Sequence, residues 1–339
     1  MTIPVTVLSG FLGAGKTTLL DNALRHPLLS NALVLINELG AISIDHHLVT
    51  TLGDSVIALP SGCICCEAKG DFEKVLLEQR ALRSFDRVVI ETSGIADPTP
   101  LIATIHYALE LAPHFHFDAL VVAFDATLGP ATIARHDEAR LQLALADDII
   151  LTKLDLAPRE EGLAAADLAR AHNAFARVFV ANRGALDWHA LLSWTRSTVA
   201  ARLDPSAAFA AGAHPTTVDS IAVRSERPCD WNALAAWLSL ATQLHGDALL
   251  RVKGLVAVED ERGPVSIQSV QRVLYPPFAL RDWPSDDRAS RVVAISRGLS
   301  QHDRDMLEDG LRAALGAAKR PRDHKWVRRR ATRAGRRAP

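Results

Sequence analysis

Short apolar runs alternate with amphipathic segments through the first 200 residues of the chain. The runs are rich in Val, Ile and Leu, which is typical of strands buried on both faces of a sheet. Six strands are expected at Ile3–Leu8, Ala32–Ile36, Arg87–Ile90, Leu120–Phe124, Ile149–Leu151 and Val178–Val180. Helical patterns are expected at Thr17–Arg25, Lys69–Leu82, Pro100–Leu111 and Leu186–Arg202. This alternation predicts an α/β fold with a doubly wound, mostly parallel sheet.

The rhythm changes after residues 204–217, which have the Ala, Gly and Pro content of a linker. Beyond it, strand-like pieces and two helices predict a second, smaller α+β domain over 218–317, following a first domain over 1–203. The strands are expected at Ser220–Arg224, Leu249–Val258, Val265–Val273 and Arg291–Ser296, and the helices at Trp231–Leu244 and Gln301–Leu315.

Composition places the chain among globular proteins, with 48% hydrophobic and 23% charged residues. Its net charge of −1 combines an acidic body with a basic tail, 318–339, that we expect to be disordered and solvated. No apolar run approaches the ~20 residues of a membrane helix, and no signal peptide is readable. Four cysteines, three of them clustered, favour a reducing compartment, so we expect a cytoplasmic protein without a membrane partner.

The strongest motif follows the first predicted strand and has the pattern G-x-x-x-x-G-K-S/T. Its glycines allow backbone N–H groups to point at phosphate oxygens, and Lys16 adds a cation for the β and γ phosphates. The Thr17 hydroxyl is placed to bind Mg²⁺. A chance Gly-rich turn is the alternative. The motif predicts a P-loop NTPase whose phosphate-binding residues are Gly10, Gly13, Ala14, Gly15, Lys16, Thr17 and Thr18.

Two further segments extend this nucleotide site. Glu91 ends an apolar strand and is followed by Gly94, the arrangement expected of a Mg²⁺-side acid and a γ-phosphate sensor, although an ordinary strand-end acid has the same pattern. The Glu side chain more plausibly reaches Mg²⁺ through a water. Later, Thr152-Lys153-Leu-Asp155 has the form of a guanine-reading motif, in which Asp155 accepts two hydrogen bonds that adenine cannot supply.

Three thiols lie within four residues at Cys63, Cys65 and Cys66. Thiolates select zinc and similar ions, and a site with three ligands leaves a position open for a metal that is passed on. The fourth ligand could be water or one of the side chains Glu38, Glu67, His46 and His47. Buried structural cysteines and a redox switch are the alternatives. Because Asn37–Gly40 lies where nucleotide switches move, metal affinity is expected to depend on nucleotide state.

Taken together, the segments resemble the CobW family of P-loop GTPases over nearly the whole chain. The resemblance rests on the P-loop, on Asn37-Glu38-Leu-Gly40, on Gly62-Cys-Ile-Cys-Cys66 as the family's C-x-C-C, on Glu91-Thr-Ser-Gly94, on Gln142–Asp147 leading into Thr152–Leu156, and on Leu250-Arg-Val-Lys-Gly254. It implies slow GTP hydrolysis with Mg²⁺ and delivery of Zn²⁺, or a cobalt-like metal, to a client metalloprotein. It also implies a catalytic or sensing role for Lys16, Thr17, Glu91 and Gly94, guanine binding by Thr152, Lys153 and Asp155, and metal binding by Cys63, Cys65, Cys66 and Glu38.

Three departures from the family pattern are visible. Ala41 and Ser43 stand where members usually carry Glu and Gly, Thr152 replaces Asn, and the linker holds only His214 rather than a His-rich tract. A small-molecule kinase and a nucleotide-dependent scaffold remain alternatives that the same P-loop would serve. No nucleic-acid partner is expected, whereas the client and the oligomeric state, a homo-oligomer included, are left open by the sequence.

Overall fold

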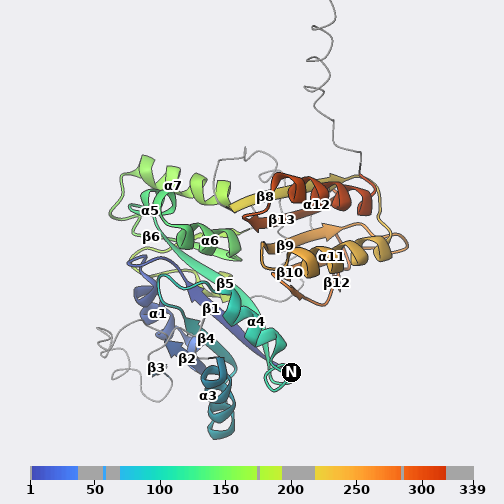
Figure 1. The fold of residues 1–339 in the computed structure, drawn as a ribbon. Coiled ribbons are helices and arrows are strands. Elements are labelled where there is room, and N and C mark those ends of the chain that lie inside the picture. Colours follow the sequence, from blue (N-terminus) through green and yellow to red (C-terminus); the bar gives the residue numbers. More distant parts are fainter. Residues whose placement is uncertain are drawn as a thin grey trace, which may run out of the picture.

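The computed structural model describes residues 2–36, 56–58, 69–173, 176–192, 218–283 and 286–317. Within them the chain forms two sheets, each with its own helices (Figure 1). The larger sheet is built by residues before 193 and the smaller one by residues from 218 onward. This arrangement confirms an α/β P-loop-type fold with a second, smaller domain of antiparallel sheet and helices.

All seven strands of the larger sheet run parallel, in the order β3-β2-β4-β1-β5-β6-β7. Their bounds are β1 Ile3–Ser9, β2 Ala32–Ile36, β3 Val56–Ala58, β4 Arg87–Glu91, β5 Phe115–Asp125, β6 Asp148–Thr152 and β7 Arg177–Val180. The central strand β1 pairs with β4 on one side and β5 on the other. Later strands are added on both sides of β1, so the strand order reverses there. In α/β sheets, ligands bind at the carboxyl ends of the strands at such a switch point.

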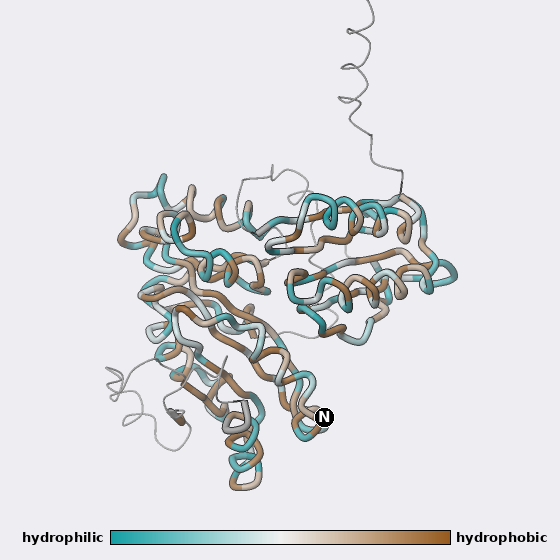
Figure 2. Tube along the Cα trace, viewed as in Figure 1, coloured by the Kyte–Doolittle hydropathy of each residue, from teal (hydrophilic) through white to brown (hydrophobic). Residues whose placement is uncertain are grey.

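Helices cover both faces of this sheet because its strands are apolar on both sides. They are α1 Lys16–Leu24, α3 Lys69–Leu82, α4 Thr99–Tyr107, α5 Gly129–Arg135, α6 Asp137–Leu145, α7 Arg159–His172 and α8 Trp188–Leu192, with a short 3₁₀ turn at Pro27–Leu29. Figure 2 shows hydrophobic colours concentrated in the strands and mixed colours along the helices. Two buried clusters result, one on each face of the sheet, and both include residues of β1.

The second domain is an antiparallel sheet in the order β11-β10-β9-β13-β8, with β12 paired to β10. Its strands are β8 Val218–Ser225, β9 Leu249–Val256, β10 Val265–Val270, β11 Val273–Leu274, β12 Phe278–Ala279 and β13 Ser290–Arg297. Its helices are α11 Trp231–His245 and α12 Gln301–Ala314. Asp230 caps α11 and Ser300 caps α12, each side chain accepting a hydrogen bond from a backbone N–H of its helix.

The structure differs from the sequence-based expectation at three elements. The piece expected at Val265–Val273 is two strands, because Gln271 adopts a left-handed backbone (φ 49°) and the chain folds back on itself there. The helix expected at Pro100–Leu111 ends at Tyr107, since Ala108 is extended. The strand expected at Leu120–Phe124 is longer and begins at Phe115.

Several predictions lie outside the described residues. These are the linker 204–217, the tail 318–339, the segment Asn37–Gly40 and the cysteine segment 62–66. The helix expected at Leu186–Arg202 is described only through Leu192, where α8 covers Trp188–Leu192. Among the described residues, no helix has the length and apolar character needed to cross a bilayer.

Candidate nucleotide site

The loop between β1 and α1 has the backbone of a phosphate-binding loop. Gly10, Gly13 and Gly15 all have positive φ angles, of 140°, 72° and 91°. A side chain at Gly10 would lie 2.5 Å from the carbonyl oxygen of Ala123 in β5, so the loop turns tightly against the sheet. Gly15 precedes the first residue of α1, and its left-handed conformation directs the loop into the helix N-terminus. Backbone N–H groups at such a terminus form an anion site.

Lys16 is buried and its ammonium group folds back along the loop. Its Nζ donates to the carbonyl oxygens of Gly10, at 2.9 Å, and Phe11, at 3.3 Å. These contacts fix the charge beside the loop's concave backbone, where an ammonium group acts on phosphate oxygens as a point charge. The structure therefore holds the Lys16 ammonium group against the first residues of the loop.

Thr17 and Glu91 come together although 74 residues separate them. The Thr17 hydroxyl donates to Glu91 Oε1 at 3.1 Å, and Glu91 is the last residue of β4, beside β1. A hydroxyl and a carboxylate are hard oxygen donors of the kind Mg²⁺ prefers. These two oxygen-bearing side chains, Thr17 at the start of α1 and Glu91 at the end of β4, thus fit the chemistry of a Mg²⁺ site.

The loop after Glu91 packs directly on the phosphate loop. A Cβ atom at Gly94 would lie 2.6 Å from the backbone nitrogen of Leu12, so only glycine permits this approach. Asp97, three residues on, accepts hydrogen bonds from the backbone N–H of Thr99, at 2.9 Å, and from the Thr99 hydroxyl. The close approach of Gly94 to Leu12 therefore holds this loop against the loop between β1 and α1.

The end of β6 braces the other side of the loop. The Thr152 hydroxyl donates to the carbonyl oxygen of Ala14 at 2.8 Å, and the carbonyl oxygen of Phe124 lies 3.3 Å from the same hydroxyl. Lys153 has a left-handed backbone (φ 59°), and its Nζ donates to Gly13 O at 2.7 Å and to Asp125 Oδ2 at 2.6 Å. The lysine stem consequently runs along the loop and presents an apolar surface on which a base could stack.

Asp155 lies on the same side, facing the loop that follows β7. Its carboxylate is 3.4 Å from Arg183 Nε, and Arg183 has a left-handed backbone (φ 50°). A Cβ at Gly184 would lie 2.9 Å from the carbonyl oxygen of Thr18, so the loop abuts α1. Thr18, Asp155 and the Arg183 loop thus surround one end of the site, at the edge where a base would be read.

Two buried polar residues of the site were missed by the sequence-based prediction. Asp125 ends β5; burial acts to raise its pKa, but hydrogen bonds from Lys153 and Thr127 outweigh burial and hold the pKa below its ordinary value. Gln142 of α6 donates through Nε2 to the carbonyl oxygens of Gly94, at 3.2 Å, and Ala96, at 2.9 Å. The signal for Asp125 was its position at the end of an apolar strand. Gln142 belongs to the segment Gln142–Asp147 that carries the family resemblance, but that resemblance gave it no role at the site.

A cavity of about 280 Å³ lies next to the phosphate loop. Phe11, Leu12 and Gly13 line one side, and Asp125, Gln142 and Lys153 contribute its polar atoms. The remaining walls come from β5, α5 and α6 and are mainly apolar. The cavity therefore adjoins the carboxyl edge of the sheet at its central strands.

The metal ligands expected from the sequence, Cys63, Cys65, Cys66 and Glu38, lie outside the described residues. Among the residues that are described, no group of three or more His, Cys, Asp or Glu side chains is arranged to hold a metal. The remaining cysteine, Cys229, is buried in the second domain, and burial raises the pKa of its thiol.

Comparison with known proteins and the loop geometry both indicate a nucleotide-binding domain. Residues 4–179 match the model of the CobW/HypB/UreG nucleotide-binding domain, and residues 218–315 match the cobalamin synthesis protein cobW C-terminal domain. Zinc chaperone YjiA of Escherichia coli is 32% identical over 91% of this chain and 99% of its own. Zinc chaperone CobW of Pseudomonas aeruginosa is 29% identical over 92% of each chain.

A solved structure agrees in fold. The crystal structure of Zn(II)-bound YjiA GTPase from E. coli superposes with a TM-score of 0.68 at 25% identity, covering 93% of this chain and 99% of that one. A triple mutant of the same GTPase, also bound to Zn(II), gives a TM-score of 0.71 at 26% identity. With both family domains matched in order, the chain belongs to the CobW/HypB/UreG family and carries the CobW C-terminal domain.

Proposed function

We propose that this protein is a GTP-hydrolysing metallochaperone that carries zinc to a client protein. The observation that supports hydrolysis most strongly is the convergence of Lys16, Thr17 and Glu91 on one glycine loop whose backbone fits phosphate. Curated relatives named zinc chaperone and zinc-regulated GTPase metalloprotein activator support the same activity.

Each side chain has a distinct part in the proposed reaction. Lys16 would neutralise charge on the β and γ phosphates, and Thr17 would hold Mg²⁺, which would supply polarisation of the γ-phosphoryl group. Glu91 accepts a hydrogen bond from the Thr17 hydroxyl and thereby orients it. The backbone of Gly94 approaches the γ-phosphate side because its lack of a Cβ lets it contact Leu12. Stabilising charge on the transferred group is the larger part of such catalysis.

Guanine selectivity is assigned to Asp155, with Lys153 covering the base and Thr152 bracing the loop. The Thr152 hydroxyl replaces the amide usual in this motif, and its bond to Ala14 O shows how a hydroxyl can hold the phosphate loop. Arg183 beside Asp155 closes the same edge. This group recognises the guanine N1–H and N2–H₂ through a carboxylate.

The cargo is assigned to the three thiols Cys63, Cys65 and Cys66, with Glu38 as a candidate fourth ligand. Three thiolates suit zinc, and one open position suits transfer to a partner. Thiolate ligands must be reduced, so the proposed activity belongs in a reducing compartment such as the cytoplasm. The client is a metalloprotein that accepts the ion.

The test of the hydrolase assignment is phosphate release from GTP by the Lys16→Ala variant. Lys74→Ala is the matched control, because Lys74 is exposed on α3 and pairs with Glu78 along its own helix. We expect the control to hydrolyse GTP like the wild type and Lys16→Ala to lose about 100-fold or more in rate. Hydrolysis by Lys16→Ala at the wild-type rate would refute the site, and transfer of phosphate to an added acceptor instead of water would identify a kinase.

A further inference from the structure

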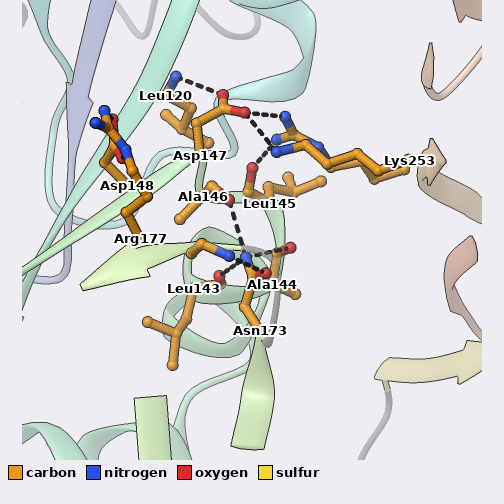
Figure 3. Close-up of polar contacts among 12 residues, drawn as sticks. Leu120, Leu143, Ala144, Leu145, Ala146, Asp147, Asp148, Asn173, Arg177 and Lys253 are labelled. Atoms are coloured by element: carbon orange, nitrogen blue, oxygen red, sulfur yellow. Dashed lines mark hydrogen bonds and ion pairs between the residues drawn. The ribbon is translucent and has the colours of Figure 1, made fainter. Parts of the chain in front are cut away.

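Two cations of the second domain are buried against the first. Arg251 and Lys253 are alternate residues of β9 and therefore project from the same face of the strand. Both reach Asp147, which lies just before β6 (Figure 3). Lys253 Nζ is 2.7 Å from Asp147 Oδ1, and Arg251 donates to the same oxygen and to the carbonyl oxygen of Leu145.

The cluster is closed to water. The side chains of Asp147 and Arg251 are each 3% exposed and that of Lys253 is 7% exposed. The second oxygen of Asp147 accepts the backbone N–H of Leu120 at 2.9 Å. Burial acts to raise the pKa of Asp147, but Arg251 and Lys253 outweigh burial and keep the pKa below its ordinary value. Removing the carboxylate of Asp147 would leave two buried cations uncompensated, so the contact depends on this residue.

Helix α6 connects this cluster to the nucleotide site. Leu145, its last residue, accepts the hydrogen bond from Arg251. Gln142 lies three residues earlier, on the same turn of the helix, and holds the carbonyl oxygens of Gly94 and Ala96. One turn of a rigid helix therefore contacts both the Gly94 loop and the second domain.

A second connection runs through helix α4. The Thr99 hydroxyl, at the start of α4, donates to Asp97 and accepts a hydrogen bond from Gln271 Nε2 at 3.2 Å. At the other end of α4, the Tyr107 hydroxyl donates to the carbonyl oxygen of Arg272 at 2.7 Å. Gln271 and Arg272 form the tight turn between β10 and β11. The loop from Gly94 to Asp97 is thus held at both ends by helices that contact the second domain.

We propose that Gln142, Gln271 and the cluster of Asp147, Arg251 and Lys253 are positioning residues, through which the second domain sets the Gly94–Asp97 loop for the γ-phosphate. This inference rests on the proposed nucleotide function, in which Gly94 meets the γ-phosphate. Coupling of this kind is reciprocal. The free energy by which the second domain strengthens binding of the triphosphate equals the free energy by which the triphosphate strengthens the contact between the domains. The C-terminal domain is thereby part of the nucleotide response.

The experiment compares binding of GDP and of a non-hydrolysable GTP analogue to the full-length variants Lys253→Met and Gln271→Ala. Lys253→Met leaves Arg251 to neutralise Asp147, and Arg312→Met is the control, because Arg312 pairs with Glu308 within α12, away from the contact with Asp147. We expect the two variants to bind the GTP analogue roughly fivefold or more weakly while GDP affinity stays unchanged, because GDP lacks the γ-phosphate. Amide exchange at residues 94–97 of the nucleotide-free protein should be faster in both than in the control.

Folded variants with wild-type exchange and an unchanged preference between the two nucleotides would overturn the inference. An equal loss of both nucleotides would also overturn it, because that result indicates general destabilisation. If Lys253→Met does not fold, Gln271→Ala decides the question alone, since its side chain is only half-buried. Failure of the wild type to bind guanine nucleotides would instead refute the proposed function, and the exchange comparison would still test the domain contact.

Discussion

At the residue scale, the polar side chains of the nucleotide site are held in place by the protein itself. Lys16 and Lys153 donate to carbonyl oxygens of the phosphate loop, and the Thr152 hydroxyl does the same. Lys153 has a left-handed backbone at this position. This conformation costs a non-glycine residue free energy, and residues that adopt it cluster at functional sites. The site is therefore preorganised, which favours binding of a ligand without large rearrangement.

Asp125 provides the first prediction at this scale, because it anchors Lys153. In Asp125→Asn the amide NH₂ would face the ammonium group in place of a carboxylate oxygen, so Lys153 loses its charged partner. We expect the affinity for GTP and GDP to fall together, about three- to tenfold, since Lys153 is partly exposed and the bond is correspondingly weakened.

The control for Asp125→Asn is Asp118→Asn, which removes a partly buried carboxylate paired with Arg87 toward the other end of β5. Nucleotide titration followed by fluorescence should show an unchanged affinity for Asp118→Asn. Equal affinities of Asp125→Asn and the wild type would show that Lys153 does not depend on this carboxylate.

Asp148 provides a prediction about pH. Burial raises its pKa to about 6 from 3.8, although Arg177 Nη2 donates to it at 2.7 Å and opposes the shift. Between about pH 4 and 6 the folded protein keeps a proton that the unfolded chain has lost, so this residue lowers stability as the pH rises through that window. In Asp148→Asn the side chain stays neutral throughout.

The measurement for Asp148 is urea unfolding of the wild type and Asp148→Asn at several pH values. The unfolding free energy of the wild type, relative to the variant, should fall by roughly 1–3 kcal/mol between pH 4 and 6. A difference that stays constant across this window would contradict the assignment of a raised pKa to Asp148.

At the scale of elements, the strands of the large sheet were predictable because strands buried on both faces are continuous apolar runs. Ala32–Ile36 and the helix Lys69–Leu82 agree with the structure to the residue. The turn at Gln271 could not be predicted from the sequence, because the hydrophobic pattern continues through it from Val265 to Val273. No glycine or proline marks this turn. The end of α4 at Tyr107 likewise lacks a local stop signal.

The contact of β6 with the phosphate loop carries a prediction at this scale. Thr152→Val keeps the side-chain shape but removes the hydroxyl that donates to Ala14 O. A net hydrogen bond contributes about 0.5–1.5 kcal/mol, so the affinity for GTP and GDP should fall about equally, by roughly two- to tenfold. The effects should be equal because Ala14 belongs to the loop assigned to the phosphates that both nucleotides share.

Thr242→Val is the matched control for Thr152→Val. Thr242 is buried in α11 of the second domain, and its hydroxyl also donates to a backbone carbonyl oxygen, that of Leu238. Calorimetric titration should give wild-type nucleotide affinity for Thr242→Val. A selective loss of GTP binding in Thr152→Val, with GDP unaffected, would place Thr152 near the γ-phosphate and contradict the present assignment.

At the scale of the whole molecule, the sequence indicated two domains but not how they meet. A strand was expected at Leu249–Val258 and is found at Leu249–Val256, but the sequence did not indicate what its two charged residues contact. The structure buries Arg251 and Lys253 against Asp147 instead, because charge pairing across the interface compensates their desolvation. Contacts of this kind depend on residues about 100 positions apart, which no local pattern reveals.

The proposed function, together with the position of Asn37–Gly40 after the phosphate loop, leads us to expect that the bound guanine nucleotide sets the zinc affinity of this chain. The most direct test of this expectation is the Zn²⁺ affinity of the reduced protein, measured by competition with a chromophoric chelator, with Mg²⁺ and either GDP or a non-hydrolysable GTP analogue bound. The account predicts affinities that differ between the two states, roughly fivefold or more, and no zinc competition by a variant with Ser at positions 63, 65 and 66. Equal zinc affinities in the two nucleotide states would contradict it.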